Sequence, residues 1–148
     1  MITALTAVYV GAWALFAPLS WFDAFPGLGL RWLPPLGPYN EHLARDVGGL
    51  YLAMAALSVA AAMRPAEDFL VRAVAIGWLV FSVPHLIFHV VHLSMYGPLD
   101  QVLNVIALAY FVLMGAALLL PTRTTSAHPT PPRPTPPRPT SGKWLSRR

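Results

Sequence analysis

Apolar residues run along the chain in four long stretches, which are separated by short segments that are polar or rich in proline and glycine. About 20 apolar residues are enough for a helix to cross a hydrocarbon core of roughly 30 Å. The pattern therefore predicts an all-α fold, a four-transmembrane-helix bundle over residues 1–121. The helices are expected at about residues 2–22, 41–63, 69–93 and 99–120.

The first stretch could also be a cleaved signal peptide, but no Lys or Arg precedes it and it is long for the apolar region of such a peptide. We therefore expect a first transmembrane helix whose last turns are loosened by Pro18. Residues 23–40 contain several prolines and glycines, so they cannot form one continuous helix. Because they are also apolar, we expect them to lie in the membrane interface or to fold back over the bundle as a cap.

The second helix has a recognisable start. Asn40 is a suitable N-cap, and Glu41 in the first turn suits the helix dipole. Further along, small residues follow a 4-3-4 spacing and predict a face for close helix packing: Gly49, Ala53, Ala56 and Ala60.

Residues 122–148 differ abruptly in composition. The sequence Thr-Pro-Pro-Arg-Pro occurs twice in succession, in a segment that cannot form a packed core. We expect a disordered, extended cytoplasmic tail that supplies positive charge. A ligand for a proline-recognising module, or a basic aromatic tip that touches anionic lipid, is the functional alternative.

Composition and charge agree with an integral membrane protein, since 56% of the residues are hydrophobic. There are no cysteines, which excludes disulfides, thiolate metal sites and cysteine nucleophiles. The net charge of +4 comes mainly from loops and tail, so we interpret it as a topology signal and expect no nucleic-acid partner. With both termini in the cytoplasm, only Arg31 and Arg45 lie outside, as the positive-inside rule requires. The predicted location is the cytoplasmic membrane, with several passes.

Three histidines near the end of the third helix are the main candidates for function. His85, His89 and His92 are spaced i, i+4, i+7, so they fall along one stripe of a helix. Pro84 is expected to kink the helix just before them. The simpler interpretation is that they are interfacial residues that bond to backbone, water or lipid head groups.

The predicted topology places most other polar residues at the same outer end of the bundle. Boundary-level ionisable residues usually face the interior and find partners, so we expect a buried polar network. Its expected members, as ligand-binding or supporting residues, are His42, Arg45, Asp46, Asp100 and Asn104.

This cluster could perform several kinds of chemistry. A divalent metal, zinc or iron, could be held by His85, His89 and His92 with Glu41 as the oxygen ligand. Haem is a less favoured cofactor, because only His42 stands opposite the third helix. Proton relay, or binding of a polar head group with Arg45 as anion contact, is a further alternative. The eight-histidine membrane desaturases are excluded, since the chain has five histidines.

Short patterns in residues 1–120 resemble the DoxX-like superfamily of small four-helix bacterial membrane proteins. They are Phe16-Ala17-Pro18 at the end of the first helix, Glu41-x-x-x-Arg45-Asp46-x-Gly48-Gly49 at the start of the second, and a polar start of the fourth. The resemblance implies an architecture more than an activity. The histidine segment does not match the general pattern of that superfamily.

The leading hypothesis is a membrane protein of unknown activity with a pocket lined by histidine and carboxylate at its extracytoplasmic end. This pocket would bind a metal ion or a small polar or lipid-like ligand. The alternative is a non-enzymatic scaffold or accessory subunit whose polar cluster is structural and whose tail binds a partner. Besides the lipid bilayer, a membrane-protein partner or a second copy of the chain is expected. No residue identifies a reaction, so the sequence leaves open whether the protein is an enzyme.

Overall fold

The computed structural model describes residues 2–120, and the predicted tail at 122–148 lies outside them. The described part is almost entirely helical, as expected. Its elements are α1 (Ile2–Phe16), α2 (Pro18–Ala24), β1 (Pro26–Gly27), β2 (Leu30–Arg31), the 3-10 turn η1 (Pro34–Leu36), α3 (Glu41–Met63), α4 (Asp68–Val91), the 3-10 turn η2 (Leu93–Met95) and α5 (Pro98–Leu119).

The first apolar stretch does not form the single helix predicted for residues 2–22. It breaks at Ala17, and α1 and α2 meet at an angle of 119°. Proline has no N–H to donate and its ring clashes with the preceding turn, so Pro18 ends one helix and occupies the first position of the next. The sequence indicated a loosened end, whereas the structure has a full change of direction.

The segment after α2 folds back over one end of the helices, as one of the two alternatives predicted. We call residues 25–36 the cap. Strands β1 and β2 pair antiparallel, and the hairpin turns through Leu28 and Gly29 at φ of 58° and 82°. Two hydrogen bonds attach the cap to the far side of the molecule. Trp32 Nε1 donates to Asp100 Oδ1 at 3.0 Å, and the Tyr96 hydroxyl donates to the Trp32 carbonyl at 2.8 Å.

Helix α3 begins as predicted, because Asn40 Oδ1 accepts a hydrogen bond from the Leu43 N–H at 3.0 Å. Its contact with α1 is made by a different face from the one predicted. Gly48 lies so close to α1 that a Cβ there would be 2.5 Å from the Leu15 nitrogen, whereas a Cβ on Gly49 would meet nothing within 4 Å. The close-packing face is therefore one residue away from the predicted stripe.

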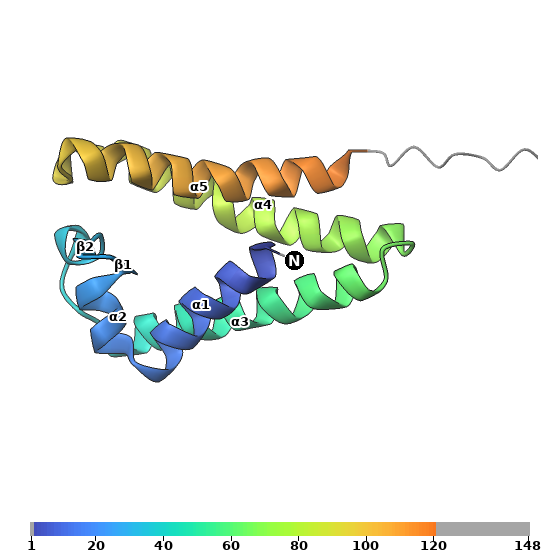
Figure 1. Ribbon diagram of the computed structural model, residues 1–148, viewed down its shortest axis with the longest axis horizontal. Helices are drawn as coiled ribbons and strands as arrows, with labels where there is room; N and C mark the ends of the chain where they lie inside the picture. Colours follow the sequence, from blue (N-terminus) through green and yellow to red (C-terminus); the bar gives the residue numbers. More distant parts are fainter. Residues whose placement is uncertain (1, 121–148) are drawn as a thin grey trace, which may run out of the picture.

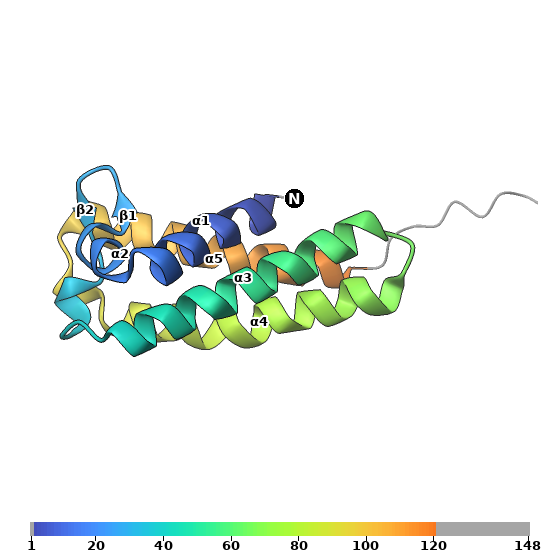
Figure 2. The same cartoon turned by 90° about the horizontal axis from the view of Figure 1, so that it is seen from below.

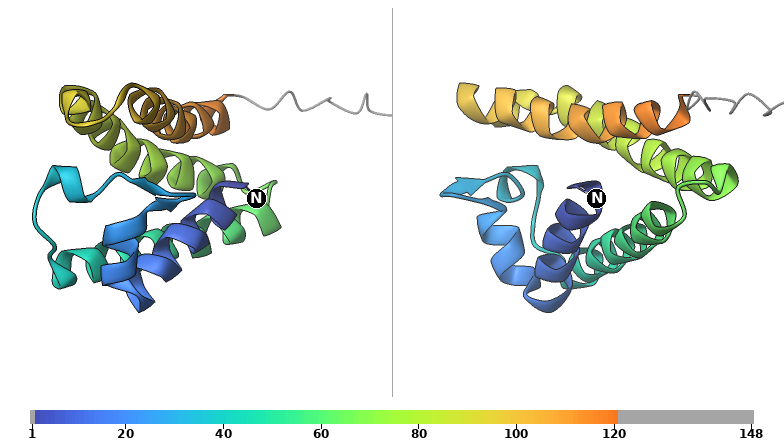
Figure 3. Two further views of the ribbon diagram at one scale, coloured as in Figure 1. Left: turned by 60° about the vertical axis from the view of Figure 1, so that its left-hand side comes forward. Right: turned by 45° about the vertical axis from the view of Figure 1, so that its right-hand side comes forward.

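The helices form two pairs. Helix α1 packs mainly on α3, and α4 mainly on α5. Figures 1 and 3 show these pairs as two layers that converge at the α3–α4 connection, with the cap between them at the opposite end. Figure 2 shows α3 and α4 running side by side along the length of the molecule. A hydrogen bond of 2.9 Å from Trp78 Nε1 to Ser58 Oγ joins α4 to α3.

Three of the helices, α3, α4 and α5, are long and apolar enough to cross a membrane. The number rises to four if α1 and α2 are counted as one bent span. Many large apolar side chains on these helices are exposed, which is the expected surface for contact with lipid.

Candidate functional site

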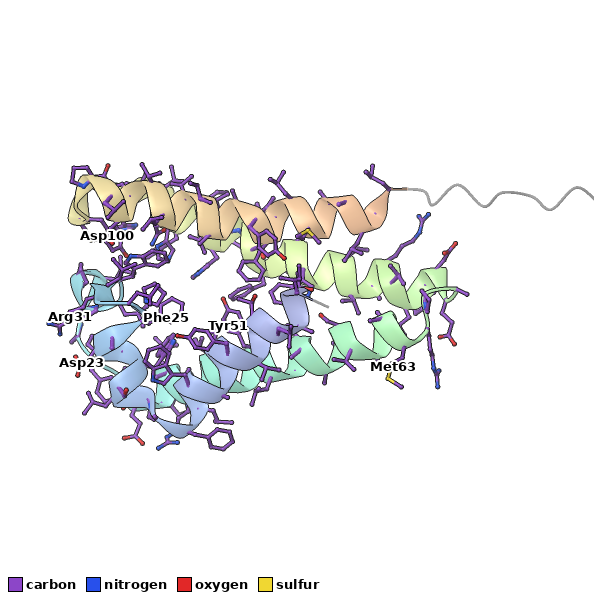
Figure 4. All side chains as sticks on the ribbon, in the orientation of Figure 1. Asp23, Phe25, Arg31, Tyr51, Met63 and Asp100 are labelled. Atoms are coloured by element: carbon purple, nitrogen blue, oxygen red, sulfur yellow. The ribbon has the colours of Figure 1, made fainter. Side chains whose placement is uncertain are left out.

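A cavity of about 400 Å³ lies between the two helix pairs, next to the cap. This size is within the range of ligand pockets in proteins. Side chains from all five helices and from the cap line it: Thr6, Tyr9, Val10, Trp21, Phe25, Pro26, Trp32, Leu33, Leu36, Val47, Tyr51, Phe81, His85, Phe88, His89, Asn104, Ala107, Leu108 and Phe111. Figure 4 shows Phe25 and Tyr51 in the space between the layers.

The wall of this cavity is mostly apolar and aromatic, with a few polar atoms. Asn104 on α5 is completely buried, and His89 on α4 is 5% exposed. The side chains of His89 and Asn104 adjoin each other. Within residues 2–120, no donor or acceptor meets the distance and angle of a hydrogen bond with His89 Nδ1 or with the Oδ1 and Nδ2 atoms of Asn104. Buried polar groups normally find a partner, since leaving one unsatisfied costs about 1–3 kcal/mol. These atoms therefore have hydrogen-bonding capacity that the described chain does not use.

The histidine stripe divides into two parts. His85 and His89 both line the cavity, and their ring centroids are 4.7 Å apart. His92 does not line it. Its Nδ1 atom lies 2.7 Å from the carbonyl of Phe88, and its ring stacks on that of Phe88 at 4.2 Å. His92 therefore has the backbone contact that the simpler interpretation expects.

The residues at the start of α3 face away from the cavity. Arg45 Nη2 lies 2.8 Å from Glu41 Oε1, and the same guanidinium donates to the carbonyl of Leu15 at the end of α1. A helix ends with carbonyls that have no helical donor, so Arg45 satisfies one of them. His42 and Asp46 form a 3.3 Å pair with side chains 88% and 62% exposed.

Asp100 holds the cap, since its carboxylate accepts the hydrogen bond from Trp32. It also lies near Tyr96. Burial, and secondly the negative charge of Asp100, raise the pKa of the Tyr96 hydroxyl to about 12. The neutral hydroxyl is the form that donates to the cap.

The structure therefore brings together only part of the predicted site. Among residues 2–120, no three His, Asp or Glu side chains are placed to hold a metal ion. His85 and His89 adjoin each other, while Glu41 and His92 are directed to Arg45 and to backbone. The four-residue metal set and the haem site with His42 remain predictions.

Sequence reasoning did not identify the aromatic side chains of the site. Trp32 and Phe25 come from the cap, Tyr51 from α3 and Phe111 from α5. The signal that could have found Trp32 is the number of apolar residues in a segment too rich in proline to be a helix. Tyr51 and Phe111 carry no such signal, because an aromatic residue in a transmembrane stretch is ordinary.

A second, outer cavity of about 270 Å³ adjoins the first. Five residues line both: Trp21, Leu33, Leu36, Val47 and Phe88. The remaining lining residues come from α2 and from the chain around the start of α3: Phe22, Gly37, Pro38, Asn40, Leu43 and Ala44.

Comparison of the chain with protein-family models, with curated proteins and with solved structures gives no match.

Proposed function

We propose that this is a multi-pass membrane protein that binds a lipid-like organic molecule in the cavity between its two helix pairs. One observation carries the proposal. Asn104 and His89 present buried, unpartnered polar atoms to a cavity whose wall is otherwise mostly apolar. An apolar cavity with a few convergent polar groups is typical of a small-molecule site.

The membrane topology belongs to the same proposal. Four spans, with α1 and α2 together as the first, place both termini in the cytoplasm by the positive-inside rule. The cap, Asp100 and the start of α3 then lie at the extracytoplasmic end. The resemblance of residues 1–120 to the DoxX-like superfamily supports this architecture and gives no activity.

A photoreactive probe tests the proposal. The full chain, reconstituted in lipid nanodiscs, is irradiated with a long-chain alkyl diazirine, and the labelled peptides are identified by mass spectrometry. We expect labelling of cavity-lining residues from both helix pairs. Ala107→Leu, which adds a larger side chain to the cavity wall, should lower that labelling several-fold. Ala116→Leu, an exposed position on the same helix, is the matched control.

Labelling confined to lipid-facing residues, with no effect of Ala107→Leu, would reject the cavity as a binding site. The measurement needs no knowledge of the natural ligand. It also separates this function from that of a scaffold, which has no ligand to lose.

Metal binding is the second candidate function, and it is favoured by the 4.7 Å separation of the His85 and His89 rings. Two imidazoles at i, i+4 supply two ligands, so a metal would need others from water or substrate. Elemental analysis of the purified protein, with the His85→Ala/His89→Ala double variant beside it, tests this. Stoichiometric zinc or iron that the variant lacks would favour the metal site over the organic ligand.

A further inference from the structure

The chemistry of the cavity wall narrows the class of ligand. We propose that the ligand is a single-chain membrane amphiphile with an uncharged hydroxyl or amide head group. It reaches the cavity laterally, from the membrane interface, by way of the outer cavity. This inference rests on the proposed function.

The head group is uncharged because the cavity wall offers no permanent charge, and its titratable side chains are His85, His89 and tyrosines. The lining residues include no Lys, Arg, Asp or Glu. A charge transferred from water into apolar surroundings without a partner is strongly disfavoured. Arg45, the cation at the start of α3, is already paired with Glu41 and with the carbonyl of Leu15.

The head group both donates and accepts hydrogen bonds. The Asn104 amide offers an acceptor, Oδ1, and a donor, Nδ2, and both lack partners in the part of the chain that the structure describes. His89 Nδ1 adds a further group in the same wall. A hydroxyl or a primary amide satisfies both kinds of atom at once, whereas a hydrocarbon satisfies neither.

The apolar part of the ligand lies among the aromatic and aliphatic side chains of the cavity wall. A volume of about 400 Å³ accommodates one chain or a molecule of drug size. The wall shared with the outer cavity, which includes Trp21, Leu33 and Val47, is apolar and continues this path.

The outer cavity provides the lateral route. Its own lining includes the exposed residues Asn40 and Leu43, at the first turn of α3, which is the level of the membrane interface in the proposed topology. At the cap, the hydrogen bonds of Trp32 with Asp100 and Tyr96 hold the chain across the outer end of the molecule. In the proposed topology, an amphiphile enters the outer cavity from the bilayer at this level.

Tryptophan quenching tests the class of ligand. The full chain in nanodiscs is titrated with chain-brominated compounds of one chain length that differ only in the head: alcohol, primary amide, carboxylate, ammonium and none. Trp21 and Trp32 line the cavity and report binding. The dissociation constant of each compound is corrected for its partition into empty nanodiscs. We expect the constants of the alcohol and the amide to be at least about tenfold lower than those of the other three compounds.

Two pairs of variants locate the effect. Asn104→Leu should remove the preference for alcohol and amide over the bare chain. Tyr110→Phe should keep it, because that hydroxyl is also buried and unpartnered in the described chain but does not line the cavity. Leu43→Phe, which narrows the outer cavity without adding a tryptophan, should slow quenching several-fold without changing its final extent. Leu50→Phe, an exposed position two turns along α3, should leave the rate unchanged.

The outcomes separate this inference from the proposed function. Quenching by none of the compounds beyond partition would reject the proposed function itself. Three results would overturn the assignment of an uncharged head group but would leave the cavity as a binding site. These are equal binding of all five compounds, tighter binding of a charged compound, and a preference for alcohol and amide that persists in Asn104→Leu. An unchanged rate in Leu43→Phe would overturn the lateral route.

Discussion

Asn104→Leu should make the empty protein more stable. The wild-type side chain is 0% exposed, and both of its polar atoms lack partners among residues 2–120. A buried unsatisfied amide costs about 1–3 kcal/mol, and leucine has a similar volume without polar atoms. Without a ligand, we therefore expect the free energy of unfolding of the variant to exceed that of the wild type by about 1–3 kcal/mol.

Reversible unfolding of delipidated protein in mixed micelles, followed by circular dichroism, measures this change. Loss of a stabilising contact instead of an unsatisfied group would lower the free energy of unfolding. A fall of about 1 kcal/mol or more in Asn104→Leu would therefore refute the interpretation that the amide is reserved for a ligand. The gain in stability should accompany the loss of head-group preference described above, as expected where a binding site is built at the expense of stability.

Three further predictions follow from the packing and from the cap. Gly48→Ala should destabilise the fold by about 1–3 kcal/mol, because its Cβ would be 2.5 Å from the Leu15 nitrogen, while Gly49→Ala should be neutral or slightly stabilising in the same unfolding assay. Trp32→Phe removes a hydrogen bond to a carboxylate and should speed amide exchange in residues 25–36, measured by hydrogen–deuterium exchange; unchanged exchange would contradict the role given to this bond. The free energy of unfolding should fall between about pH 10 and 12, because the Tyr96 hydroxyl has a pKa of about 12 in the folded protein and loses its proton at lower pH in the unfolded chain. Measured against pH, the free energy of unfolding of Tyr96→Phe should fall less over this range.

Hydrophobic periodicity and length predicted the long helices well, because crossing a membrane demands about 20 apolar residues whatever the tertiary contacts are. Helix α3 has the predicted bounds, and α4 and α5 begin within one residue of the predicted positions. Pro18 was correctly identified as a point of weakness. The angle of the turn there depends on how α2 packs on α3, which no local pattern encodes.

The candidate site was predicted only in part, since helical spacing places residues on a face but does not say which partner that face meets. Three of the predicted residues line the cavity: His85, His89 and Asn104. Their spacing along the helices and their similar distance from the helix ends had placed them together. Arg45 could not be assigned from sequence, because its partner is the carbonyl of Leu15, which became available where α1 ends. Asp100 likewise binds Trp32, a contact between residues 68 positions apart.

The break after α1 has a consequence for the surrounding bilayer. Helix α1 has 15 residues, which at 1.5 Å per residue gives a length of about 22 Å, against a hydrocarbon core of roughly 30 Å. In the proposed topology, α1 alone is shorter than that core, and α2, which completes the span, bends away from it by 119°. Hydrophobic mismatch of this kind is relieved by local thinning of the lipid. We expect the outer leaflet to be thinnest where α2 and the start of α3 border the outer cavity, which shortens the distance between the head-group layer and the site.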